Sequence, residues 1–146
     1  MSARTCGLML QTLLIVALVA PLSAAQAGSA RFGDYHIHYA AQPTAGLSPE
    51  VAQQYGIVRS RAQAMVIISV RENDAPVPAR VSGGVQTDSG QQRDIRFRRV
   101  EAGGAVNYVG TFRAKHMETL NFQLEVFPET AQRNYPVRFR ETFYMD

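Results

Sequence analysis

His36 and His38 are the first side chains in this 146-residue sequence whose types and spacing suit chemistry. Residues two apart on a β-strand point to the same side of a sheet, so both imidazoles would face one way. Two such imidazoles suit a metal site, which would need a third ligand such as Asp34 or His116. We adopt the simpler interpretation, two solvent-facing strand residues without a site. A second functional interpretation is that their partial protonation near neutral pH tunes a binding face.

Tyr55 and Arg59 form a second candidate site, at the junction of a predicted helix and a predicted buried strand. A partly covered guanidinium needs a compensating carboxylate, for which Asp34 and Glu50 are the candidates. We expect such a structural ion pair at Arg59. The alternative is a polar binding site in which Arg59, the hydroxyl of Tyr55 and His38 hold a metal or an anion.

Arginines crowd two predicted strands. They are Arg93, Arg96, Arg98 and Arg99 in one segment, and Arg138 and Arg140 on one face of the last strand. If the two strands were neighbours, a basic stripe would result that suits phosphate or sulphate groups. We expect instead an evenly solvated face, because the formal net charge is only +3 and acidic residues are interspersed.

Glu141 lies in the inward phase of the last predicted strand, together with Val137, Phe139 and Phe143. An ionised carboxylate is costly to bury without a partner, so the sequence predicts an arginine partner or a bulge that shifts the phase. A buried catalytic acid is the third interpretation. No second carboxylate clearly shares that face, and such chemistry commonly uses a pair.

The sequence lacks the usual motifs of nucleophilic, nucleotide-dependent or metal-dependent catalysis. Gly-x-Ser-x-Gly, a phosphate-binding glycine loop, a dinucleotide fingerprint and His-Glu-x-x-His are all missing. Cys6 is the single cysteine, and it lies ahead of the apolar segment described next. We therefore predict no catalytic residue, no metal and no cofactor.

Residues 1–27 have the features of a cleavable signal peptide. Arg4 supplies the positive end, and Leu8 to Ala20 is apolar except for Gln11 and Thr12. Ala25 and Ala27 are small residues at the −3 and −1 positions. The apolar run is shorter than the roughly 20 residues that a membrane span needs. We predict export to the periplasm and a mature domain of residues 28–146 without cysteine or a stable membrane span.

The mature chain reads as one all-β domain built around Ala64–Val70, an unbroken apolar run that needs cover on both faces. One short helix is expected at about residues 49–55, between Ser48 as N-cap and Gly56 as C-terminal cap. Short alternating segments joined by turns predict seven or eight strands in an antiparallel, immunoglobulin-like β-sandwich. We further expect a loose N-terminus at 28–31, one continuous strand at 93–100, and a bulge or sharp bend at Gly83-Gly84.

Several stretches together resemble the exported bacterial family known as domain of unknown function 4426. They are Phe32-Gly33-Asp34-Tyr35, His38-Tyr39, 47–52, 55–60, Leu120-x-Phe122 and Thr142-Phe143-Tyr144-x-Asp146. The family has an asparagine after the His-Tyr pair, where this chain has Ala40. The resemblance implies a periplasmic protein of a Gram-negative bacterium and brings no activity with it.

These observations predict a non-catalytic periplasmic module that binds another envelope protein or a small anionic ligand. The alternative is a periplasmic enzyme, or a metal- or anion-binding protein, that uses His38, Tyr55 and Arg59. Nucleic acid is not an expected partner in that compartment, and the sequence favours no particular oligomeric state.

Overall fold

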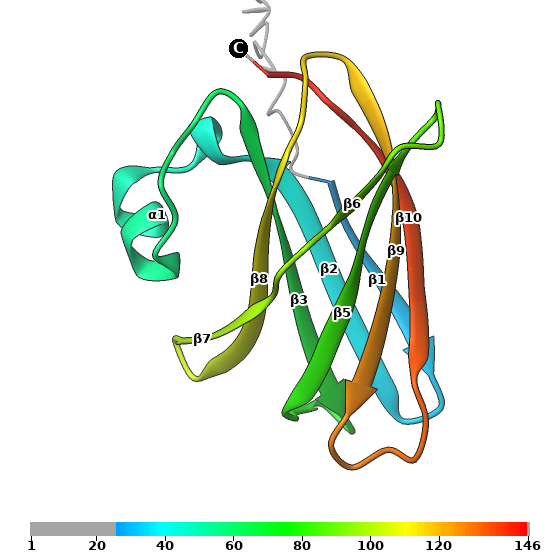
Figure 1. Cartoon of the computed structure of the whole chain (residues 1–146). Coiled ribbons are helices and arrows are strands. Elements are labelled where there is room, and N and C mark those ends of the chain that lie inside the picture. Colours follow the sequence, from blue (N-terminus) through cyan, green and yellow to red (C-terminus); the bar gives the residue numbers. More distant parts are fainter. Residues whose placement is uncertain (1–25, 146) are drawn as a thin grey trace, which may run out of the picture.

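The computed structural model describes residues 26–145, which fold into two antiparallel sheets packed face to face (Figure 1). Sheet A has the order β1 (Gln26–Phe32), β2 (Tyr35–Pro43), β3 (Gln63–Glu72), β8 (Ala105–Arg113) and β7 (Arg98–Ala102), with β4 (Ala75–Pro76) also on β3. Sheet B has the order β10 (Tyr135–Phe143), β9 (Glu118–Pro128), β5 (Ala79–Thr87) and β6 (Gln92–Asp94). The predicted all-β sandwich is confirmed. The two shortest strands, β4 and β6, raise the number of strands above the seven or eight expected.

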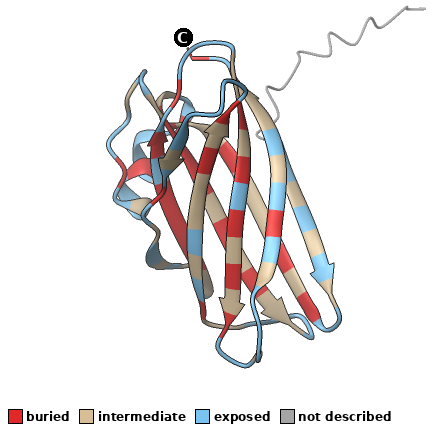
Figure 2. Cartoon of the chain, turned by 45° about the vertical axis from the view of Figure 1, so that its right-hand side comes forward, coloured by how far each residue is buried: buried red, intermediate tan, exposed pale blue. Residues whose placement is uncertain are grey.

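Strand β3 lies in the middle of sheet A, between β2 and β8, as its apolar run predicts. Its alternate residues Val66, Ile68 and Val70 point between the sheets and are at most 1% exposed. On the opposite face Met65 is equally buried and packs against Val109 of β8. Along most of the strands, buried residues alternate with more exposed ones (Figure 2). Strand β3 departs from this alternation, because consecutive residues near its start are buried and the strand is covered there on both faces.

Helix α1 (Pro49–Tyr55) follows the 3₁₀ turn Thr44–Gly46 and provides that outer cover. The hydroxyl of Ser48 accepts a hydrogen bond from the amide of Val51, and Gly56 ends the helix in the left-handed conformation with φ +61°. Both expected caps are confirmed. The helix lies beside the sheet of β2, β3 and β8, away from β5, β9 and β10 (Figure 1). It has no room to be longer, because Gly56 turns the chain back toward the sheet.

Two local expectations were wrong, and of the third, a bulge or sharp bend at Gly83-Gly84, the bulge is contradicted. The segment 28–31 is not loose, because it belongs to β1, whose seven residues pair with β2. The segment 93–100 is not one strand, because Ile95 to Phe97 carry the chain from sheet B to sheet A. No bulge interrupts the register of β5 with β9. At Gly83, which has φ +127°, an added Cβ would lie 2.1 Å from the carbonyl oxygen of Gln123, so glycine permits a close approach of the two strands.

The described part of the chain contains no helix long and apolar enough to cross a membrane. The predicted signal peptide lies outside the described residues except for Gln26 and Ala27, which begin β1. Cleavage after Ala27 would leave Gly28 to Phe32 of that strand paired with β2.

Candidate functional site

The two histidines lie on the outer face of sheet A, among basic side chains from both neighbouring strands. The register places Arg31 of β1 and Arg71 of β3 on either side of His36. Ser29 and Ser69 flank His38 in the next row. Because directly paired residues of antiparallel strands point to the same face, these six side chains form one patch, which we call the His/Arg patch.

Within the His/Arg patch the imidazoles of His36 and His38 are in contact, with ring centroids 4.1 Å apart. Partial burial lowers the pKa of His38, and the charges of His36, Arg71 and Arg31 lower it further. His38 is therefore biased toward its neutral form by its partial burial and by the basic groups around it. A negatively charged ligand in the patch would reverse that bias.

The structure places no third ligand for a metal beside the two histidines among the described residues. No cluster of three or more His, Cys, Asp or Glu side chains suited to a metal occurs in residues 26–145. His116 belongs to the turn between β8 and β9, where its ring lies 6.2 Å from that of Tyr144. The surrounding arginines also oppose a cation at the two histidines, because like charges repel.

Arg59 does not form the expected ion pair. Its guanidinium is exposed and donates a hydrogen bond to the carbonyl oxygen of Ala45 at 3.0 Å, and the pair with Asp34 or Glu50 is absent. The reason is that the chain after Gly56 runs along the surface before β3 begins at Gln63. Within residues 26–145, no side-chain hydrogen bond joins Tyr55, Arg59 and His38 to one another, and Tyr55 packs as a half-buried residue against the cluster under α1.

Arg98 takes a role at this corner that the sequence did not reveal. From β7 it donates hydrogen bonds to the carbonyl oxygens of Tyr55 and Gly56, the latter at 2.9 Å. These carbonyls end α1, where basic side chains are favoured. The contact joins residues more than 40 positions apart, so only the crowding of arginines at 93–99 hinted at it.

A groove of about 490 Å³ lies beside this helix end. Its polar lining consists of Ser60, Gln63, Thr111, Arg96 and Arg98, and its apolar lining of Ile57, Val58 and Val109, with Gly56 at the helix end. No acidic side chain contributes to the lining. The groove thus offers guanidinium, amide and hydroxyl donors beside the apolar side chains of Ile57, Val58 and Val109.

The alternative of a basic stripe on neighbouring arginine-rich strands is not found. Arg98 is in sheet A, whereas Arg138 and Arg140 are on the outer face of sheet B. There Arg138 pairs with Glu125 at 3.7 Å and Arg140 with Asp88 at 2.9 Å. The charges of sheet B are therefore balanced, as expected for a solvated face.

On sheet A, in contrast to sheet B, the outward basic side chains are not paired with carboxylates among the described residues. By the strand register, the outward residues of sheet A with a basic or imidazole side chain are Arg31, His36, His38, Arg71, Arg98 and Arg113. No outward strand position of sheet A is Asp or Glu within residues 26–145, and none of these four arginines forms an ion pair there. We call this surface the basic face.

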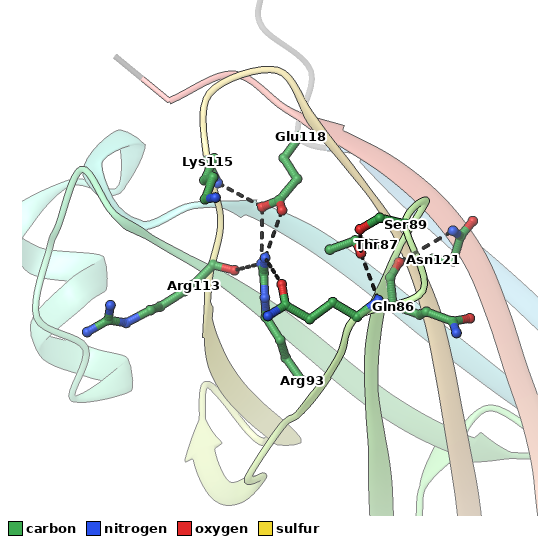
Figure 3. A network of polar contacts seen from close by, with 9 residues as sticks. Gln86, Thr87, Ser89, Arg93, Arg113, Lys115, Glu118 and Asn121 are labelled. Carbon is green, nitrogen blue, oxygen red and sulfur yellow. Dashed lines mark hydrogen bonds and ion pairs between the residues drawn. The ribbon is translucent and has the colours of Figure 1, made fainter.

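Arg93 supplies the structural ion pair that we expected at Arg59. It lies between the sheets' edges and binds the carboxylate of Glu118 and the carbonyl oxygen of Arg113 (Figure 3). The amide of Lys115 donates to the same carboxylate at 2.9 Å. This network ties β6 to the turn between β8 and β9, so Arg93 is a structural residue.

Glu141 is half-buried in the predicted inward phase, with no ion pair among the described residues. In the same inward phase, Val137 and Phe143 are each 1% exposed, and Phe139 is half-buried. Burial raises the pKa of Glu141, and a hydrogen bond from the backbone of Thr142 opposes that shift. Neither the arginine partner nor the bulge is present, and the register of β10 with β9 is unbroken.

The fold and these surfaces define a small antiparallel β-sandwich protein with one short helix on the outer face of a sheet. The chain belongs to the family described as Domain of unknown function (DUF4426), whose family model matches residues 29–146. The resemblance found in the sequence is thereby confirmed.

A solved structure of a DUF4426 family protein (PA0388) from Pseudomonas aeruginosa PAO1 is 31% identical, with a TM-score of 0.74, covering 82% of this chain and 96% of that one. Two structures of FetP from uropathogenic Escherichia coli strain F11 are more distant. A copper-bound variant is 8% identical, with a TM-score of 0.59, covering 79% of this chain and 93% of its own. The protein as isolated after expression in the periplasm is 7% identical, also with a TM-score of 0.59, covering 80% and 93%. At these identities the likeness to FetP shows the fold alone. No curated protein matches the chain.

Proposed function

We propose that this protein is a non-catalytic periplasmic binding module whose basic face receives a small anionic ligand. The observation that carries the proposal is the charge of that face, on which four arginines and two histidines point outward without an acidic strand residue among them. Export rests on the signal-like segment 1–27.

Two arginines of the basic face, Arg71 and Arg98, are suited to an anion because hydrogen bonds to backbone carbonyls hold them in place and leave other donors free. Arg71 donates to the carbonyl oxygen of Asp74 at 3.0 Å, and Arg98 donates to the carbonyls that end α1. Each guanidinium has five N–H donors in a planar fork that matches carboxylate and phosphate oxygens. A backbone carbonyl uses some of these donors without cancelling the positive charge.

Metal binding is the second candidate function, and the likeness to a copper-bound FetP variant is the reason to test it. His36 and His38 are the side chains that would hold the ion. The pair lies between Arg31 and Arg71, so a divalent cation would meet repulsion where an anion meets attraction. The same surroundings therefore favour the anionic ligand.

Isothermal titration calorimetry at low ionic strength tests the proposal, with citrate as a probe that carries several carboxylates. We expect binding that weakens as salt is added, and a loss of about tenfold or more in affinity for the double variant Arg71→Gln/Arg98→Gln. The matched control is Arg138→Gln/Arg140→Gln on sheet B, which removes the same charge and should bind like the parent. Equal losses in both double variants, or no binding by the parent, would overturn the proposal.

Mass spectrometry of the protein from the periplasm of a Gram-negative host tests the proposed export. We expect an N-terminus at or near Gly28, since Ala25 and Ala27 mark the cleavage site. A mature species that still carries Leu8 to Ala20 would contradict cleavage.

A further inference from the structure

We propose that the His/Arg patch is a site for one tetrahedral oxyanion, such as the phosphate group of a small phosphorylated ligand. Arg31, His36, His38 and Arg71 would bind its oxygens. The inference rests on the proposed function, because it assigns a particular part of the basic face to a particular class of anion.

The spacing of the patch fits a single small anion. Neighbouring strands lie about 4.8 Å apart, so the Cα atoms of Arg31 and Arg71 are separated by about 10 Å, with His36 between them. Arginine side chains of that separation are long enough to reach over the central strand from both sides. The anion would then lie above the contacting imidazoles of His36 and His38, between two guanidinium groups.

The second row of the patch adds neutral donors. Ser29 and Ser69 are paired with His38 across β1 and β3, so their hydroxyls belong to the same surface. A tetrahedral oxyanion has more acceptor oxygens than a carboxylate and can use donors from several directions. Two guanidiniums, two imidazoles and two hydroxyls drawn from three strands therefore suit a phosphate group better than a carboxylate.

The charges around the patch also favour an anion over a cation. Of the groups on β1, β2 and β3, those that shift the titration of His38 are His36, Arg71 and Arg31, and all three are basic. Three acidic residues are near in the chain. Glu72 follows Arg71 but is paired with the inward-facing Tyr35, on the other face of sheet A, where its carboxylate accepts a hydrogen bond from Thr130 at 2.7 Å. Asp34 and Asp74 are exposed residues of hairpin turns. Arg71 is bound to the backbone oxygen of Asp74 and not to its carboxylate.

Binding at this site should be linked to protonation of the histidines. An oxyanion beside His36 and His38 stabilises their charged forms, so binding takes up protons and affinity rises as the pH falls. Sulfate is the better probe of this linkage, because its charge stays constant over the range in which phosphate itself titrates.

The test is an NMR titration of the mature protein with sulfate at about pH 5.5 and about pH 7.5, on either side of the ordinary histidine pKa. We expect the ring signals of His36 and His38 to shift with sulfate, and the affinity at the lower pH to be about three- to tenfold higher. His116, which lies on the turn before β9, is the internal control and should not respond.

Variants separate this site from the rest of the basic face. His38→Gln should reduce the pH dependence, and the double variant His36→Gln/His38→Gln should abolish it. Arg71→Gln should weaken sulfate binding at both pH values, while Arg80→Gln on sheet B leaves both unchanged. If sulfate leaves the rings of His36 and His38 unmoved while citrate still binds and depends on Arg98, the oxyanion site is wrong and the proposed function stands. If Cu²⁺ or Zn²⁺ moves those rings and sulfate does not, the pair is a cation site and the inference is overturned.

Discussion

Arg93 and Glu118 form a two-pronged ion pair, with Nη2 2.8 Å from Oε1 and Nη1 3.1 Å from Oε2. The two side chains are 20% and 15% exposed, so water screens the pair less than it does the ion pairs of sheet B. The pair joins β6 to the end of the β8–β9 turn, two segments 25 residues apart. It therefore stabilises the edge where the chain passes from one sheet to the other.

Glu118→Gln should lower the free energy of unfolding by about 1–3 kcal/mol, because the guanidinium of Arg93 keeps its place but loses its charged partner. Urea denaturation measures the change. The control is Glu125→Gln, which removes an exposed carboxylate from the 3.7 Å pair with Arg138 and should change stability by less than about 0.5 kcal/mol. Equal effects of the two substitutions would contradict the structural role of Arg93.

The effect of Glu118→Gln should depend on pH in a definite direction. The hydrogen bond from Arg93 is the main cause that holds the pKa of Glu118 below its ordinary value of 4.5. A carboxylate whose pKa is lower in the folded state stabilises the fold above its unfolded pKa, and this stabilisation is lost as the pH falls through the folded value. The difference between parent and variant should thus be constant near neutral pH and shrink in acid below about pH 4.

Glu141→Gln should raise the stability of the protein at neutral pH, whereas Glu118→Gln should lower it. Burial raises the pKa of Glu141, so its ionised form destabilises the folded state above that pKa and the penalty disappears as the pH falls. We expect a higher midpoint of thermal unfolding for the variant near pH 7, and midpoints that converge with the parent below about pH 4. A variant less stable than the parent at neutral pH would show that the carboxylate has a partner.

Arg98→Gln and Arg59→Met should differ in their effects on stability. Arg98 binds the two carbonyls that end α1, so its loss should cost about 0.5–1.5 kcal/mol. Arg59 is exposed and has one hydrogen bond, to the carbonyl of Ala45, so its loss should cost less than about 0.5 kcal/mol. Denaturant midpoints measure both, and the reverse order would restore Arg59 as the structural residue of this corner.

Ile68→Ala should cost about 2–5 kcal/mol, because Ile68 is fully buried between the sheets and a cavity would remain. Ile67 points to the outer face and is half-buried beside α1, so Ile67→Ala should cost less, about 1–2 kcal/mol. Chemical denaturation of both variants tests whether packing against α1 contributes less to stability than packing against sheet B. A larger loss at Ile67 would mean that the outer cluster is the main core.

Local signals were enough to predict the central strand and the helix. An apolar run without alternation identified β3, and the two caps Ser48 and Gly56 identified α1. Strand β1 was missed because Gly28, Ser29 and Ala30 have little intrinsic preference for strands. Its pairing depends on β2, and an added Cβ on Gly28 would lie 2.5 Å from the ring of Tyr39.

The passage from β6 to β7 was missed for a different reason. A strand that changes sheets at Ile95 to Phe97 has the same alternation as one that continues, so the pattern alone does not mark the crossing. The basic face was likewise out of reach, because its residues lie on different strands and share a surface only through the register of Arg31, His36 and Arg71. The sequence shows how many arginines the chain has, but it does not show that those on the outer face of sheet A have no carboxylate beside them on the strands.

The most direct test of the basic face is NMR mapping of arginine side chains during a citrate titration at low ionic strength. The Nε–H signals of Arg31, Arg71 and Arg98 on sheet A should shift with citrate, because their guanidiniums have no carboxylate partner among the described residues. Those of Arg138 and Arg140, which are paired on sheet B, should stay in place. Shifts of equal size on both sheets, or shifts confined to sheet B, would contradict the account.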